Sequence, residues 1–151
     1  MLKIRKKFKF ETAHRLVSSY STRCQSFHGH SYTVDLVLKG STLNDDDMVV
    51  DFGEVKADVG DMFDLFDHSM VLSDQDPFTP RMIDIMKEGN MRYLIVSYNP
   101  TAERMAQHFY KELKGQGHDV DSVRVHETLT GWAECTAISH DNLMFVEIGG
   151  M

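Results

Sequence analysis

Alternation of apolar and polar residues predicts two β-strands near the start of the chain. In Ile4–Phe10 the apolar side chains stand at even positions and the basic side chains at odd positions, with Lys6 breaking the series. His28–Lys39 alternates in the same way. Such alternation is typical of a strand with one face in the core and one in water. Gly40 and an acidic turn follow, and Met48–Val50 is expected to return as a short strand.

Apolar residues three and four apart predict two long helices. The first begins after Asp51, a cap with Glu54 three residues later, as in a capping box. The second has Thr101 as its cap and ends at Gly115 and Gly117. Their apolar stripes consist of Phe52, Val55, Val59, Met62 and Phe66 in the first helix and of Ala102, Met105, Ala106, Phe109 and Leu113 in the second.

The segment between these helices is irregular. Pro77 and Pro80 interrupt Ser73–Gly89, so only a short helix at Met82–Lys87 is expected there. Tyr93–Tyr98 is expected to be a buried strand.

Two more strands are expected after the second helix. They are Ser122–Thr128 and Cys135–Ser139, the latter with a continuation through Met144–Ile148. Strands and helices are segregated along the chain, which favours an α+β fold with an antiparallel sheet and helices on one face. We expect one domain over residues 1–151.

Composition and charge narrow the class of protein. The 151 residues are 42% hydrophobic and 26% charged, as in ordinary globular domains. No apolar run reaches the roughly 20 residues of a membrane-spanning helix, and the basic start lacks the apolar segment of a secretory signal. Two cysteines cannot form a disulfide framework, so we expect a cytoplasmic protein. The net charge of −7 argues against nucleic-acid binding.

Five basic residues lie within the first nine positions and leave two interpretations open. They could hold a small anionic ligand, or they could protect an edge strand from pairing with other chains. The residues are Lys3, Arg5, Lys6, Lys7 and Lys9.

Three histidines form a candidate metal site. His28 and His30 are two residues apart in a predicted strand, so their rings project from the same face. His14 has the parity of Phe8 and Phe10 and could reach the same place if the two first strands pair. Three His ligands with one open position are the pattern of catalytic zinc. The alternative for His-x-His alone is a pair of surface or core histidines.

Other candidate residues also allow two interpretations each. Cys24 could be a fourth, closing metal ligand, or a thiol beside a cation that acts as a base or nucleophile. Asp67 could orient His68 for proton transfer, or the two could be polar residues at a helix end. Glu127 shares the parity of a buried face, so it requires a partner, either a ligand with a pair of NH groups or a residue such as Arg124.

Six segments together resemble the 6-pyruvoyl- and 6-carboxy-tetrahydropterin synthase superfamily. They are Phe10–Leu16, Cys24–Tyr32, Met48–Lys56, Leu65–His68, Asn99–Glu103 and Val123–Thr128, in that order. The three residues between Cys24 and His28 resemble the bacterial 6-carboxy type, which belongs to queuosine (7-deazapurine) biosynthesis.

This resemblance implies a role for each matching residue. His14, His28 and His30 correspond to ligands of Zn²⁺. Cys24 corresponds to the proton-accepting thiol. Asp67 and His68 correspond to an acid/base pair, and Glu127 corresponds to the carboxylate that anchors the pterin ring. The motif that contains Thr101 and Glu103 lies near the pterin pocket in the family.

The resemblance also implies a reaction and an assembly. The substrate is 7,8-dihydroneopterin triphosphate, and the 6-carboxy branch releases acetaldehyde and triphosphate. The alternatives are 6-pyruvoyl-tetrahydropterin synthesis and a non-catalytic zinc module that binds a pterin or purine. The family fold is the tunnelling fold, β-β-α-α-β-β with a four-stranded antiparallel sheet, assembled as trimers or pairs of trimers with sites between subunits. This chain departs from the pattern at Phe66, in an insert around Ser73–Tyr98 and in the tail His140–Met151.

Overall fold

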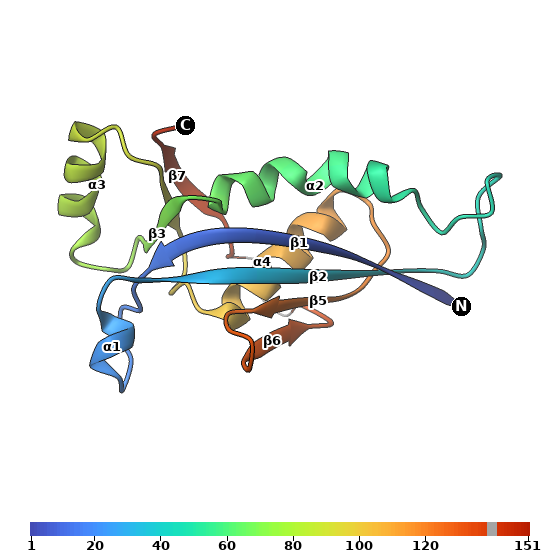
Figure 1. Ribbon diagram of the computed structural model, residues 1–151, viewed down its shortest axis with the longest axis horizontal. Helices are drawn as coiled ribbons and strands as arrows, with labels where there is room; N and C mark the ends of the chain where they lie inside the picture. The colour runs from blue at the N-terminus through green and yellow to red at the C-terminus, as the bar shows by residue number, and fades with distance from the viewer. Residues whose placement is uncertain (139–141) are drawn as a thin grey trace.

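A seven-stranded sheet runs through the molecule, in the strand order β6-β5-β2-β1-β3-β4-β7 (Figure 1). The computed structural model describes residues 1–138 and 142–151. The strands are β1 (Leu2–His14), β2 (His28–Gly40), β3 (Ser69–Ser73), β4 (Tyr93–Val96), β5 (Val120–His126), β6 (Trp132–Cys135) and β7 (Phe145–Gly149). The helices are α1 (Thr22–Gln25), α2 (Phe52–Phe66), α3 (Thr79–Glu88) and α4 (Ala102–Gly115).

The α+β class is confirmed, but the prediction of a four-stranded antiparallel sheet is wrong. β3 pairs in parallel with both β1 and β4, and β7 adds a further strand antiparallel to β4. The sheet is therefore mixed. The pattern could not reveal this because β3 and β4 are short and almost wholly buried, so they lack the alternation that marks a half-exposed strand.

Several boundaries also differ from the predictions. Met48–Val50 forms no strand, because Asn44 closes a turn there, with its side-chain oxygen accepting from the backbone N–H of Asp46 and of Met48. The helix expected at Met82–Lys87 begins three residues earlier. The strand expected at Cys135–Ser139 is wrong, because β6 ends at Cys135 and residues 136–138 form no strand. Ser139 lies outside the described residues, as do His140 and Asp141 of the expected tail.

Helices cover both faces of the sheet, which corrects the expectation that they lie on one. α2 and α4 contribute to the main apolar core with Phe10, Tyr32 and Leu36. Met86 of α3 instead packs with Leu72, Tyr93 and Ile95. Alternate residues of β4 enter the two cores, so α3 lies against the opposite face.

Both predicted helix caps are confirmed. The side chain of Asp51 accepts hydrogen bonds from the backbone N–H of Gly53 and of Glu54 at the start of α2. Thr101 Oγ1 accepts from the backbone N–H of Arg104 at the start of α4. The cap at Thr101 fixes where α4 begins, and the residue just before this cap, Pro100, contributes to the site described below.

A buried histidine in α4 makes the stability of the protein depend on pH. His108 is fully buried, and its Nδ1 lies 2.6 Å from the hydroxyl of Tyr98. Burial lowers the pKa of His108 from 6.5 to about 4. The native state therefore binds fewer protons than the unfolded state between these values, so its stability is complete above pH 6.5 and falls as the pH drops towards 4.

We expect this loss of stability to be on the order of 3 kcal/mol for His108. It is measured as the free energy of urea unfolding of metal-free protein at pH 7 and at pH 4.5. The variant His108→Gln should lose clearly less stability over the same range than the unaltered protein. Equal losses in both proteins would contradict the assignment to His108.

Candidate metal centre and pterin site

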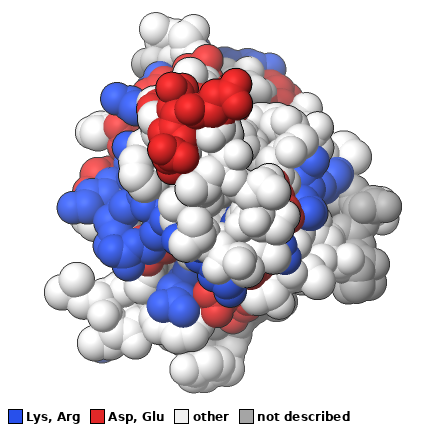
Figure 2. Space-filling model, turned by 90° about the vertical axis from the view of Figure 1, so that its right-hand side faces the viewer, with Lys and Arg blue, Asp and Glu red and all other residues white. Residues whose placement is uncertain are grey.

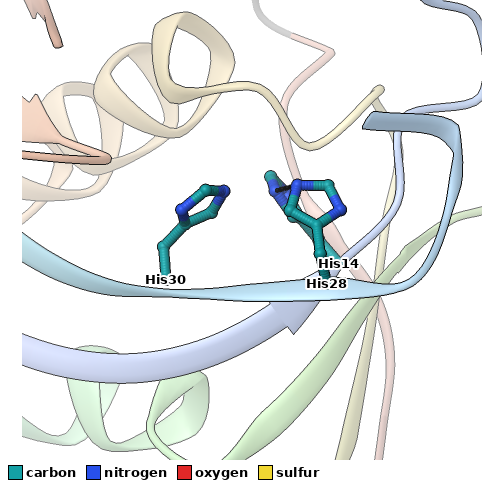
Figure 3. Close-up of side chains that lie close together, drawn as sticks. All are labelled: His14, His28 and His30. Atoms are coloured by element: carbon teal, nitrogen blue, oxygen red, sulfur yellow. Dashed lines mark hydrogen bonds between the residues drawn. The ribbon is translucent and has the colours of Figure 1, made fainter. Parts of the chain in front are cut away.

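Pairing of β1 with β2 brings the three predicted histidines together (Figure 3). His14 stands directly opposite His28, and Thr12 opposite His30, so all three rings project from one face of the sheet. The ring centroids are 4.6 Å apart for His14 and His28, 4.9 Å for His28 and His30, and 5.3 Å for His14 and His30. One nitrogen from each ring lies within 4.8 Å of the other two. The prediction that these residues form one cluster is confirmed.

Two backbone carbonyls set the direction of the imidazole lone pairs. Nδ1 of His14 lies 2.8 Å from the carbonyl oxygen of Pro100, and Nδ1 of His28 lies 2.7 Å from that of Ser26. A carbonyl only accepts, so each Nδ1 carries the proton and each Nε2 presents a lone pair. The two Nε2 atoms face each other at 3.1 Å. Two lone pairs at this distance repel unless a cation lies between them.

The distances fit a metal ion. Two nitrogens bound to one tetrahedral ion at about 2.0–2.1 Å each are about 3.3 Å apart. His30 supplies a third nitrogen, since its buried Nε2 has no hydrogen-bond partner. Among the described residues, the group that can hold a metal contains these three histidines and does not include Cys24. This arrangement favours an open metal site over one closed by the thiol.

Burial keeps two of these histidines in the neutral form that binds metals. The pKa of His14 is lowered to about 4, chiefly by burial and further by the neighbouring His28 and His30, against the opposing bond to Pro100. The pKa of His30 is also lowered, again chiefly by burial. Protons therefore compete weakly with a metal at neutral pH.

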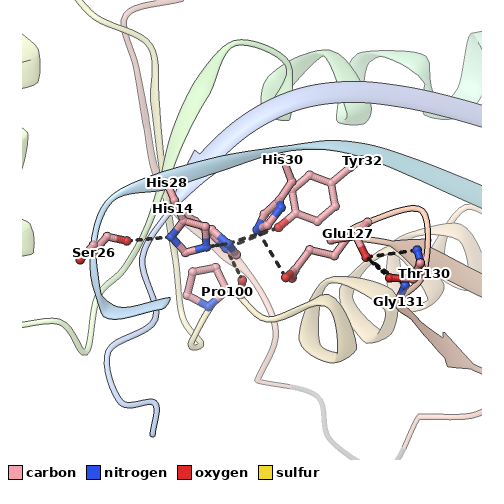
Figure 4. A network of polar contacts seen from close by, with 10 residues as sticks. His14, Ser26, His28, His30, Tyr32, Pro100, Glu127, Thr130 and Gly131 are labelled. Carbon is pink, nitrogen blue, oxygen red and sulfur yellow. Dashed lines mark hydrogen bonds and ion pairs between the residues drawn. The ribbon is translucent and has the colours of Figure 1, made fainter. Parts of the chain in front are cut away.

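Glu127 lies beside the histidines, at the end of β5 (Figure 4). One of its carboxylate oxygens is 3.4 Å from Nε2 of His30. It also contacts the hydroxyl of Tyr32, whose pKa is raised by burial and by this carboxylate. Arg124, the alternative partner considered for Glu127, pairs instead with Glu134 at 3.3 Å. Glu127 thus faces the metal group, as its parity predicts.

The other predicted site residues, Cys24, Thr101 and Glu103, lie in different parts of the structure. Cys24 lies in α1, between β1 and β2, and is partly exposed. Thr101 uses its hydroxyl to cap α4. Glu103 is exposed and lines a groove with Gln107 and Glu134, and none of the three histidines is among the residues that line this groove.

Asp67 and His68 form a close pair on a different side of the sheet. Asp67 Oδ2 is 2.9 Å from His68 Nδ1, and Asp67 Oδ1 accepts a 2.8 Å hydrogen bond from the backbone N–H of Glu11. That bond is the main cause of the lowered pKa of Asp67. His68 lines a cavity of about 500 Å³ together with His30 and with Glu11 and Ser31, and the side chains of the last two alternate along the strands with those of the metal group. The pair is bonded to the main chain of Glu11, whose side chain points to the face opposite the metal group.

Comparison with known proteins agrees with this architecture. The family model of 6-pyruvoyl tetrahydropterin synthase matches residues 3–137. The chain belongs to this family. A 6-carboxy-5,6,7,8-tetrahydropterin synthase from Aquifex aeolicus is 34% identical over 126 residues, which cover 74% of this chain and 78% of that protein. A protein of the same name from Rickettsia felis is 30% identical, covering 85% of this chain and 95% of the relative.

Solved structures of pterin synthases share the fold. The 6-pyruvoyl tetrahydropterin synthase of Caenorhabditis elegans superposes with a TM-score of 0.65 at 20% identity, covering 91% of this chain and 96% of that one. An uncharacterized protein from Wolinella succinogenes gives a TM-score of 0.74 at 20% identity, covering 89% and 97%. The family is enzymatic and acts on pterins, and the resemblance found in the six sequence segments is confirmed.

Three of the five basic residues near the start of β1 lie close to carboxylates of this chain. Lys3 pairs with Asp121 at 2.7 Å, and Arg5 and Lys7 lie 3.8 and 3.6 Å from the buried Asp35. They stand at odd positions, on the face opposite the histidines. Figure 2 views the end of the molecule that carries the N-terminus and shows acidic side chains interspersed with the basic ones.

Three contributors to the site were missed from the sequence. Ser26 and Pro100 act through their backbone carbonyls, and a pattern of side chains in the sequence does not predict such contacts. Tyr32 could have been found, since it continues the even series of His28 and His30.

Among the helices of the described residues, none combines the length and apolarity that crossing a membrane requires.

Proposed function

We propose that this chain is a zinc-dependent lyase that converts 7,8-dihydroneopterin triphosphate and water into 6-carboxy-5,6,7,8-tetrahydropterin, acetaldehyde and triphosphate, a step of queuosine biosynthesis. The observation that carries the proposal is the convergence of three imidazole nitrogens beside the carboxylate of Glu127. The names of the Aquifex and Rickettsia relatives support the 6-carboxy branch. Two free cysteines suit a cytoplasmic enzyme.

His14, His28 and His30 would hold the Zn²⁺ ion. Three neutral imidazoles with no thiolate or carboxylate among them match catalytic zinc, which keeps a position free for substrate. When bound, the ion acts as a Lewis acid on the oxygens of the substrate side chain. Pro100 and Ser26 orient two of the ligands through their carbonyls.

The proton steps are assigned to Cys24, Asp67 and His68. Cys24 would take the proton from a side-chain carbon of the substrate, since it lies on the loop between the strands that carry the metal ligands. His68 would move the proton, and Asp67 keeps its ring in one orientation through the bond to Nδ1.

Glu127 is assigned to the pterin ring. A carboxylate accepts two parallel N–H bonds, which matches the ring NH and the exocyclic amino group of a pterin. Tyr32 would hold Glu127 in place through its hydroxyl. Thr101 and Glu103 remain proposed neighbours of the pterin pocket, with Thr101 close to it through Pro100.

A complete site requires a second copy of the chain. Asp67 and His68 are bonded to Glu11, whose side chain points away from the metal group, so we infer that they act at the metal group of another chain. Of β1, only Thr12–His14 pairs with β3 among the described residues, and the main chain of Glu11 bonds the Asp67–His68 turn, which leaves the edge of Leu2–Phe10 open for another subunit. We therefore propose a homo-oligomer, a trimer or a pair of trimers, with sites between subunits.

Product identification tests the proposed reaction. The zinc-loaded protein is incubated with 7,8-dihydroneopterin triphosphate, and the products are identified by mass spectrometry. Acetaldehyde with a carboxypterin supports the proposal. A pyruvoyl product would select the 6-pyruvoyl branch, in accordance with the description of the family model. Binding without conversion would indicate a non-catalytic pterin module.

Replacing Glu127 tests the role of the pterin anchor. Glu127→Gln keeps the shape but loses the charge and one acceptor, so we expect kcat/KM to fall about 10–100-fold, with most of the change in KM. Zinc content should stay the same. The matched control is Glu134→Gln, since Glu134 pairs with Arg124 on the opposite face. An unchanged KM in Glu127→Gln would reject the anchor role.

A further inference from the structure

The turn that carries Asp67 and His68 holds an uncommon backbone conformation. His68 has a φ of +56°, in the left-handed region that residues other than glycine rarely adopt. The turn follows directly on the last residue of α2, where the final carbonyl groups have no partner within the helix. Contacts from outside the helix must therefore keep the turn in place.

One set of contacts comes from β1. The backbone N–H of Glu11 donates to Asp67 Oδ1 at 2.8 Å, and the carbonyl of Glu11 accepts from the N–H of His68 at 2.7 Å. These bonds hold the side chain of Asp67 and the backbone N–H of His68 against β1. They do not reach the carbonyl groups at the end of α2, of which that of Leu65 accepts a 2.7 Å hydrogen bond from Oγ of Ser69.

Arg92 supplies the second set. Its Nη2 donates to the carbonyl oxygen of Asp64 at 2.6 Å, and its Nε donates to that of Asp67 at 3.2 Å. The guanidinium also lies 3.8 Å from the carboxylate of Asp64. A cation at the carboxyl end of a helix is favoured by the helix dipole, and the planar guanidinium can bond two carbonyls at once.

The main chain of Arg92 rests on the sheet. Its carbonyl accepts from the N–H of Met70 at 3.1 Å, next to the pairing of β3 with β4. The guanidinium therefore connects the turn to the hydrogen-bonded strands β3 and β4.

We propose that Arg92 is a positioning residue for the Asp67–His68 pair, acting through the two backbone carbonyls that it bonds. This inference rests on the proposed function, in which His68 moves a proton. Arg92 itself bonds the protein main chain and acts on the reaction through the turn. It is contributed by the segment Ser73–Tyr98, which gives part of that segment a role in the chemistry.

The test is a double-mutant cycle of Arg92→Ala and His68→Ala, measured with the zinc-loaded enzyme. We expect Arg92→Ala to lower kcat about 10-fold or more with KM changed less than about twofold, and to lower kcat no further when His68 is already alanine. Arg81→Ala, an exposed arginine of α3, is the matched control and should leave kcat unchanged.

Two further measurements keep the test decisive. The ¹⁵N spectrum of His68 should show a single tautomer, with the proton on Nδ1, in the unaltered protein and a mixture in Arg92→Ala. If Arg92→Ala does not fold, Arg92→Lys replaces it, since one ammonium group cannot reproduce both bonds of the planar fork. Equal kcat values for Arg92→Ala and the unaltered protein, or losses that multiply in the double variant, would overturn the proposal. Absence of turnover in the unaltered protein would instead reject the proposed function, leaving the ¹⁵N comparison to decide the role of Arg92.

Discussion

Replacing Cys24 by alanine should lower kcat by about 10²–10⁴-fold, the range for loss of a residue that transfers a proton. Zinc should remain bound at one ion per chain, because the group that holds a metal consists of three histidines without this thiol. The protein should also keep its melting temperature, since Cys24 is partly exposed in the one-turn helix α1. Steady-state kinetics and metal analysis of the same preparation check both statements.

The outcome for zinc separates two kinds of site. If Cys24→Ala lost its metal and its fold together, Cys24 would be a structural ligand and the lyase assignment would fail. The matched control is Cys135→Ala, which removes a buried thiol of the core and should leave kcat and zinc content as they are.

Replacing His28 by glutamine should remove both the metal and the activity. Changing a group that only orients a ligand usually costs 10–100-fold in metal affinity, so loss of a ligand should cost at least about 100-fold. The remaining pair, His14 and His30, offers two nitrogens, too few for the tetrahedral site. Zinc titration of metal-free protein measures the affinity directly.

His118→Gln is the control for this substitution. His118 pairs with Asp58 at 3.0 Å, outside the metal group, so its loss should leave zinc affinity unchanged. Equal zinc affinity in His28→Gln and the unaltered protein would show that the three rings do not act as one site.

Strand parity predicted that His28 and His30 share a face, because alternation depends only on local geometry. His28 and His30 share a face by alternation, and His14 joined them once the pairing of β1 and β2 placed it opposite His28. The caps at Asp51 and Thr101 were predictable for the same reason, since a side chain there bonds a backbone group two or three residues away.

The mixed sheet could not be predicted in this way. β3 and β4 are buried on both faces, so their sequences do not show which strand they join or in which direction. The position of His68 relative to the metal group depends on that pairing, because β3 places the residues before it next to Glu11. Arg92 acts on backbone carbonyls, which carry no signal in the sequence.

The most direct test adds zinc back to metal-free protein while turnover of 7,8-dihydroneopterin triphosphate is followed. The account predicts no turnover without metal and a rate that rises in proportion to zinc, reaching its maximum at one ion per chain. Full turnover in the metal-free protein, or none with one zinc ion bound per chain, would contradict the assignment of His14, His28 and His30 as the centre of the reaction.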